Sequence, residues 1–111
     1  MIPTPSSALY LHYVVKEGKV NELLGHLRTI LDECAKEDDF ITAILHQTPE
    51  RPLELTLYEL WRGTRETFAQ TQGTRAYRKV YMEASRPLVD SVQVSWDTPI
   101  HVWGQFGPLG G

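Results

Sequence analysis

The sequence predicts an α+β fold, in which two helices pack on one face of a four-stranded antiparallel sheet. Four short segments alternate their apolar side chains with a period of two, as strands do. Two longer segments repeat apolar residues at helical spacing. In chain order the segments read strand, helix, strand, strand, helix, strand. Right-handed crossovers then place both helices on the same side of the sheet.

The first strand is predicted over residues 8–16. Its alternating side chains are largely apolar on both faces, which is typical of a central strand that is covered on both sides. A break at Glu17 and Gly18 precedes a helix predicted over residues 19–38. The apolar stripe of this helix fills an arc of roughly 140°, and it needs a sheet to lie on. The stripe consists of Val20, Leu23, Leu24, Leu27, Ile30, Leu31, Cys34 and Ala35.

Two strands joined by a short turn are predicted next. The second strand covers residues 40–48 and the third covers residues 53–61. The turn between them, residues 49–52, has a proline at each end. So short a connection favours a β-hairpin. Along the third strand Glu59 and Trp61 share one face, because side chains alternate with a period of two.

The second helical region begins near Thr64, which is a suitable N-cap residue. Residues 72–74 interrupt this region, and Thr74 can cap a second helical segment. The buried stripe of that segment is predicted to consist of Tyr77, Val80, Tyr81 and Ala84. Pro87 weakens or ends the helix, since the residue before a proline avoids the helical conformation. A fourth strand is predicted over residues 91–97.

The two ends of the chain differ in composition. Residues 1–7 contain two prolines and two serines, and they predict a loose lead-in. Residues 99–111 are rich in glycine and proline, but they also contain Ile100, Val102, Trp103 and Phe106. A freely solvated tail rarely needs such side chains, so we expect part of this tail to dock.

Length and composition limit the class of protein. A chain of 111 residues and 12.7 kDa forms one domain, here residues 1–111. The net charge is −3 and the pI about 5.7, which argues against a nucleic-acid-binding surface. A single cysteine, Cys34, excludes an internal disulfide framework. No apolar run approaches the roughly 20 residues needed to cross a membrane, and no signal peptide is visible. We therefore expect a cytoplasmic protein.

The predicted architecture leaves one face of the sheet without a cover. Both faces of the strands carry large apolar side chains, and a large exposed apolar patch usually marks an interaction site. A second copy of the chain that packs sheet to sheet is the least demanding cover. The sequence therefore predicts a homodimer, with a pocket between or within the paired sheets.

Four short segments of the chain form a familiar pattern. They read VKEGKV at 15–20, ILHQTP at 44–49, LYELW at 57–61 and TRAY at 74–77. This pattern resembles the antibiotic biosynthesis monooxygenase family of dimeric α+β barrels. The resemblance covers about residues 8–97 and implies a ferredoxin-like subunit, paired through its sheet, with a pocket near the open sheet face. The family includes cofactor-free oxygenases that convert anthrones and hydroquinones to quinones. It also includes haem-degrading oxygenases, a sugar-phosphate isomerase and proteins of no settled activity.

One departure from the family pattern bears on the cofactor. Many members carry His-x-x-Thr-Pro-His in the second helical region, where residues 70–77 of this chain read QTQGTRAY. A histidine ligand for haem has no candidate there. The four histidines also lack the spacing of a metal site. We therefore expect neither a cofactor nor a metal, and the quinone oxygenase mechanisms that use those histidines are weakened.

Two titratable residues are the candidate catalytic groups. His46 follows an apolar strand segment, and an imidazole is a suitable general base near neutral pH. Glu59 lies beside Trp61 on an apolar surface, where desolvation raises the pKa of a carboxyl and lets it hold or shuttle a proton. The alternative readings are a half-buried structural histidine and a glutamate that pairs with a basic residue across the dimer.

Four residues are candidate substrate contacts. Trp61 offers a flat wall and one N–H donor to an aromatic ligand, and His12 reaches the same ligand if its strand face is the pocket face. Tyr77 and Tyr81 lie one helical turn apart and can line a pocket. Each of the four can instead fill the core or play a structural role. The cationic side chains next to Tyr77, Arg75 and Arg78 among them, are expected to be solvated.

These residues predict a pocket with aromatic walls and a titratable group, and the resemblance supplies the oxygen chemistry. The leading hypothesis is a homodimeric, cofactor-free monooxygenase that oxidises an electron-rich aromatic or polyketide-type substrate with O2. An anthrone, a naphthol or a hydroquinone would be such a substrate. One alternative is an isomerase, cyclase or dehydratase that acts by proton transfer in the same pocket. Another is a non-catalytic dimer that binds a small ligand.

Overall fold

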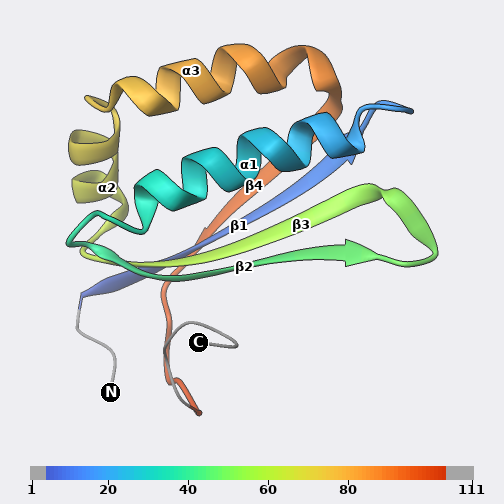
Figure 1. Cartoon of the computed structure of the whole chain (residues 1–111). Coiled ribbons are helices and arrows are strands. Elements are labelled where there is room, and N and C mark those ends of the chain that lie inside the picture. Colours follow the sequence, from blue (N-terminus) through green and yellow to red (C-terminus); the bar gives the residue numbers. More distant parts are fainter. Residues whose placement is uncertain (1–4, 105–111) are drawn as a thin grey trace.

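The computed structural model describes residues 5–104, and it has the predicted ferredoxin-like α+β architecture. The elements are β1 (Ser6–Val15), α1 (Val20–Cys34), β2 (Phe40–Thr48), β3 (Arg51–Arg62), α2 (Arg65–Gln72), α3 (Ala76–Ser85), a short 3-10 turn η1 (Arg86–Leu88) and β4 (Val89–Asp97). The helices form one layer over a single face of the sheet, with α2 at one end of that layer (Figure 1). Within residues 5–104, no helix lies on the opposite face of the sheet.

The four strands form one antiparallel sheet in the order β2-β3-β1-β4. β1 pairs with β3 on one side and with β4 on the other, so its predicted central position is confirmed. The register places Leu9 opposite Glu59, and Leu11 opposite Leu57, on the face that the helices cover. β2 and β3 form the predicted hairpin.

The core lies between α1, α3 and the helix-covered face of the sheet. Its larger cluster joins Tyr13 and Val15 of β1 to Leu23 and Leu27 of α1 and to residues of β3. A smaller cluster at the α2 end joins Ile30, Cys34 and Trp61. The predicted apolar stripe of α1 therefore packs as expected, with Leu23 and Leu27 both fully buried.

Local chemistry explains why the second helical region is two helices. Thr64 and Thr67 cap each other's backbone at the start of α2, which satisfies two N–H groups that the helix leaves unpaired. At the end of α2, a Cβ atom on Gly73 would lie 2.6 Å from the carbonyl oxygen of Ala69. Only glycine fits this closely without a shift of the backbone. The chain then turns and restarts as α3.

α1 ends at Cys34 instead of continuing to residue 38 as predicted. Residues 35–39 form turns that lead into β2, where Phe40 N–H donates to the carbonyl oxygen of Glu37. Four of these five residues are polar or charged, so no apolar stripe ties them to the sheet. The turn brings Glu37 beside the junction of α2 and α3, where its carboxylate accepts hydrogen bonds.

In the single chain, two apolar residues of the segment after β4 are exposed, and docking of this segment onto a partner stays a prediction. Ile100 is 100% exposed and Trp103 is 82% exposed. Beyond β4 the chain leaves the sheet on the side away from the helices, where a single chain offers no further layer (Figure 1). Phe106, which was expected to contribute to docking, lies outside the described residues. Among residues 5–104, no helix has the length and apolar character required to cross a bilayer.

Candidate active site

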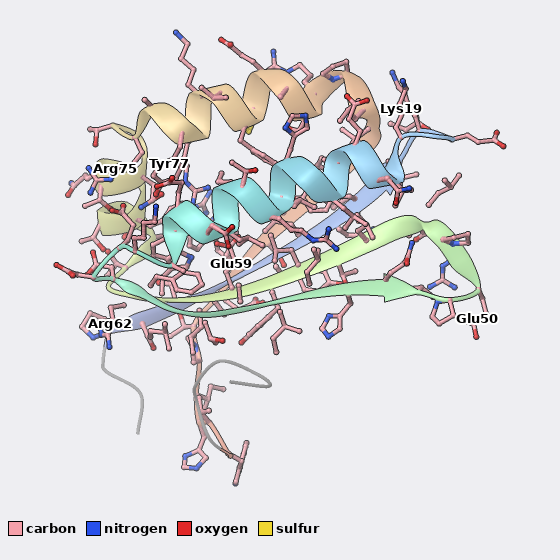
Figure 2. All side chains as sticks on the ribbon, viewed as in Figure 1. Lys19, Glu50, Glu59, Arg62, Arg75 and Tyr77 are labelled. Carbon is pink, nitrogen blue, oxygen red and sulfur yellow. The ribbon has the colours of Figure 1, made fainter. Side chains whose placement is uncertain are left out.

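Glu59 is a carboxylate buried between the sheet and the helices. It lies on β3 and is 4% exposed. Its Oε1 atom accepts a hydrogen bond of 2.9 Å from Nε1 of Trp61, which lies two residues further along the same face. Trp61 is 2% exposed and packs edge-on against Phe40 and Phe68. Figure 2 shows Glu59 between α1 and the sheet.

Burial dominates the proton affinity of Glu59. Desolvation raises the pKa of this carboxyl above its usual range, because the charged form loses its hydration. The Trp61 hydrogen bond and the positive charge of Arg78 favour the carboxylate and lower the pKa in part. Such a group binds a proton more readily than a solvated glutamate, and it can therefore take part in general acid–base chemistry.

An enclosed cavity of about 80 Å³ lies next to Glu59, between the sheet, α1 and α3. Apolar side chains form most of its wall. The polar or titratable groups at the wall are Tyr13, Cys34, Glu59, Arg78 and Tyr81. This combination of an apolar wall with a few convergent polar groups is typical of small-molecule sites.

Arg78 brings a positive charge into this apolar region. Its guanidinium lies 5.9 Å from the ring centre of Trp61 and 4.9 Å from that of Phe68. Nε of Arg78 donates to Oε1 of Gln72 at 2.7 Å, and Nη2 of Arg78 donates to Sγ of Cys34 at 3.4 Å. The prediction that Arg78 is solvated is therefore wrong, since the side chain is half-buried. Its position three residues before Tyr81, on the same helix face, was the available signal.

Gln72 and Glu37 hold Arg78 in place. Gln72 is 1% exposed, and its amide nitrogen donates to Oε2 of Glu37 at 2.7 Å. This contact turns the amide oxygen of Gln72 toward Arg78. Nε of Arg75 also donates to Glu37 at 2.7 Å, and this hydrogen bond is the main reason that the pKa of Glu37 is lowered. The sequence prediction missed Gln72, whose position at the helix break was its only distinctive feature.

Tyr77 belongs to this network instead of the cavity wall. Its hydroxyl donates to Oε1 of Gln72 at 2.8 Å and lies 3.3 Å from Oε2 of Glu37. Desolvation raises the pKa of Tyr77 to about 12. Figure 2 shows Tyr77 and Arg75 together at the corner formed by α2 and α3. Tyr77 does not line the cavity, but it packs beside Ile30 and Cys34, which do.

Tyr81 does line the cavity, together with a second tyrosine from β1. The hydroxyl of Tyr81 donates to the hydroxyl of Tyr13 at 3.2 Å. Burial raises the pKa of both phenols, so both stay protonated and can donate hydrogen bonds at physiological pH. Burial also raises the pKa of the Cys34 thiol to about 11, so the thiol stays protonated and is a poor nucleophile at physiological pH.

His46 and His12 lie on the opposite face of the sheet from Glu59. His46 pairs with Thr56, and Thr56 pairs with His12, so the three form one row across the open face. Thr56 and Glu59 are three residues apart on β3, and an odd spacing puts their side chains on opposite faces. Nε2 of His12 lies 2.8 Å from a carboxylate oxygen of Glu54.

The structure thus divides the six predicted site residues. Glu59 and Tyr81 line the cavity, whereas Trp61 holds Glu59 by a hydrogen bond without lining the cavity itself. Tyr77 lies in the adjoining network, and His12 and His46 lie on the open face. The enclosed cavity lies on the helix-covered side of the sheet, whereas the resemblance implies a pocket near the open face. Within residues 5–104, no three His, Cys, Asp or Glu side chains are placed to hold a metal ion.

Comparisons with known proteins reveal the fold but no close relative. No protein-family model matches the chain, and no curated protein sequence matches it significantly. Solved structures do match. A candidate antibiotic biosynthesis monooxygenase from Nitrosomonas europaea is 15% identical, with a TM-score of 0.79, over 94% of this chain and 99% of that chain.

Two further structures support the same architecture. A candidate antibiotic biosynthesis monooxygenase from Chloroflexus aurantiacus is 15% identical, with a TM-score of 0.72, over 89% of this chain and 97% of that chain. A variant of SnoaB, a cofactor-independent oxygenase from Streptomyces nogalater, is 11% identical, with a TM-score of 0.77, over 90% of this chain and 98% of that chain. The resemblance to the antibiotic biosynthesis monooxygenase family is thereby confirmed at the level of the fold.

Proposed function

We propose that this protein is a cofactor-free monooxygenase that oxidises an electron-rich aromatic substrate with O2. The observation that carries the proposal is the buried Glu59 carboxylate at an apolar cavity, held by the Trp61 N–H and near the charge of Arg78. The fold shared with SnoaB, a cofactor-independent oxygenase, adds support. A fold hosts several reactions, so the site chemistry must decide between them.

The proposed reaction begins with proton transfer to Glu59. Its carboxylate removes a proton from the acidic CH2 group of an anthrone, or from a phenol O–H, and leaves an electron-rich anion. The guanidinium of Arg78 and the hydroxyl groups of Tyr13 and Tyr81 stabilise the negative charge in surroundings that exclude water. The anion then gives electrons to O2 directly. For an anthrone the CH2 group becomes C=O, and the second oxygen atom leaves as water.

Each of the other residues has a supporting role in this proposal. Trp61 orients the carboxylate of Glu59 through the 2.9 Å hydrogen bond. Gln72, fixed by Glu37, orients Arg78. His46 is not assigned the base, because it lies on the other face of the sheet. The cavity does not need His46 as a base, since Glu59 already provides a proton acceptor there.

We also propose that the protein acts as a homodimer paired through the open sheet face. Tyr10 and Ile44, which both pair with Tyr58 in one row of that face, are 40% and 37% exposed. Ile100 and Trp103, beyond β4, expose still more apolar surface. Together they form an apolar surface of the kind that marks an interface between proteins. In this assembly His12 and His46 would lie at the interface instead of at the reacting atoms.

Oxygen uptake by the purified, metal-free protein tests the proposed reaction. The substrates are a panel of anthrones, naphthols and hydroquinones. We expect turnover by the wild-type protein and a loss of kcat of about 100-fold or more in Glu59→Gln, the usual size of a general-base effect. Glutamine can still accept the Trp61 hydrogen bond, so the fold is kept. His46→Gln is the matched control and should retain most of the activity.

The pH dependence provides a second readout of the same step. The base must be deprotonated, so kcat/KM should rise with pH through the raised pKa of Glu59. Arg78→Gln should move this rise to higher pH, because the positive charge that lowers the Glu59 pKa is removed. Substrate consumption without oxygen uptake would instead support the isomerase or cyclase alternative. Full activity in Glu59→Gln would contradict the assignment of the base.

A further inference from the structure

The enclosed cavity is too small for the substrates proposed above. Its volume is about 80 Å³. A protein cavity of roughly 150 Å³ is known to bind one benzene molecule, so the Glu59 cavity has room for no more than part of an aromatic ring system. A substrate with two or three fused rings must therefore extend beyond this cavity.

A groove beside the cavity provides the missing space. It has a volume of about 640 Å³, within the range of small-molecule sites, and it lies among α2, α3 and Trp96 of β4. Arg78 and Met82 line both the groove and the cavity, so the two spaces are neighbours on either side of these side chains. Met82 is 52% exposed and unbranched, and such a side chain adapts easily to a ligand.

The groove combines an aromatic wall with positive charge. Phe68 and Trp96 pack edge-on with ring centres 4.9 Å apart, and the Arg65 guanidinium lies 5.7 Å from the Trp96 ring centre. The cationic side chains that line the groove are Arg65, Arg75, Arg78 and Lys79. Among the described residues, no Asp or Glu lines it. Four cations in one groove are notable in a chain whose net charge is −3.

Most of this positive charge is available to a ligand. Arg75 is paired with Glu37 at 2.7 Å. Within residues 5–104, Arg65, Arg78 and Lys79 form no salt bridge, and Arg78 is held by the neutral amide of Gln72. The carboxylates Glu66 and Asp97 line a neighbouring hollow, which shares only Arg65 and Trp96 with the groove.

We propose that this groove binds the anionic group of an aromatic carboxylate. The reacting part of that substrate occupies the Glu59 cavity, the remaining rings lie against Phe68 and Trp96, and its carboxylate lies near Arg65 and Lys79. The inference rests on the proposed function, because that function places the reacting atoms of the substrate beside Glu59. It deepens that function by naming an acidic aromatic compound as the substrate class.

Binding of a matched ligand pair tests the groove separately from catalysis. Anthraquinone-2-carboxylate and the neutral anthraquinone-2-carboxamide have the same rings and lack the reactive CH2 group, so neither is turned over. Calorimetry should show that the wild-type protein binds the carboxylate about fivefold or more tightly. Arg65→Gln combined with Lys79→Gln should remove this preference and leave carboxamide binding unchanged. Lys16→Gln combined with Lys19→Gln removes the same charge elsewhere and should change neither affinity.

Different results would overturn the groove proposal and the proposed reaction. Equal binding of the two ligands, equal losses for both in the groove variant, or no binding of either ligand would overturn the groove proposal. A carboxylate preference that persists in Glu59→Gln is expected, because this variant alters the cavity and not the groove. The wild-type protein can also be given anthrone carboxylates as substrates. If it prefers the carboxylate ligand in binding but takes up no oxygen with these substrates, the monooxygenase proposal is refuted and the proposal of an acidic aromatic ligand is upheld.

Discussion

The two faces of the sheet place similar chemical groups in different environments. On the helix-covered face, Glu59 is 4% exposed and receives a hydrogen bond from a buried tryptophan. On the open face, Glu54 contacts His12 and Arg51, and its side chain is 24% exposed. Burial raises the pKa of Glu59. Residue type alone therefore does not identify a catalytic group, because the environment on either side of one strand decides how strongly it holds its proton.

The largest expected difference between the two faces concerns stability. Trp61→Ala removes an indole that is 2% exposed and packs between two other rings. We expect the free energy of unfolding to fall by about 3–5 kcal/mol. Tyr10→Ala, on the open face at 40% exposure, should cost only about 1 kcal/mol. Urea unfolding at several protein concentrations measures the free energy of unfolding of both variants. Equal losses of stability would contradict the prediction that the more buried side chain contributes more.

Two carboxylates should give opposite pH dependences of stability. The folded-state pKa of Glu59 is raised, so its contribution is full below the unfolded-state pKa and is lost as pH rises through the folded-state value. The stability of Glu59→Gln relative to wild type should therefore increase as pH rises from about 4, the unfolded-state pKa of a glutamate, through the raised folded-state pKa. The pKa of Glu37 is lowered, chiefly by the Arg75 hydrogen bond, so its contribution is present at neutral pH and is lost in acid.

Urea unfolding from pH 3 to pH 8 compares the wild-type protein with Glu59→Gln and Glu37→Gln. The Glu37→Gln variant should be destabilised at neutral pH and should approach the wild type as the pH falls through the lowered pKa of Glu37. If the stabilities of the two variants relative to wild type changed with pH in the same direction, the predicted opposite pH dependences would be wrong.

The smallest predicted effect concerns association through the open face. Ile44→Glu places a charge at a position that the proposed dimer buries, and burying an unpaired charge is costly. We expect the dissociation constant of the dimer to rise at least about tenfold, equivalent to about 1.4 kcal/mol. Val80→Glu, on α3 and 65% exposed, is the control on the other side of the molecule. Sedimentation that shows a monomer for all proteins would remove the dimer proposal.

Patterns with a short period were predicted well from the sequence. The bounds of β2 agree with the predicted residues 40–48, because alternation and a proline turn define this strand locally. The stripe of α1 was also predicted, whereas its end at Cys34 was not. That end depends on turn hydrogen bonds and on the contacts of Glu37 with the α2–α3 corner, which are not local in sequence.

The sequence by itself determined the order of the elements and the face on which each strand residue lies. It placed Glu59 beside Trp61, since two residues of a strand that are separated by one position share a face. Only the tertiary structure decided which face is closed by helices, and so which titratable group is buried. It also brought Arg78 of α3 and Cys34 of α1 to the same cavity as Glu59. Those contacts join residues far apart in the chain, and they depend on packing that no local pattern specifies.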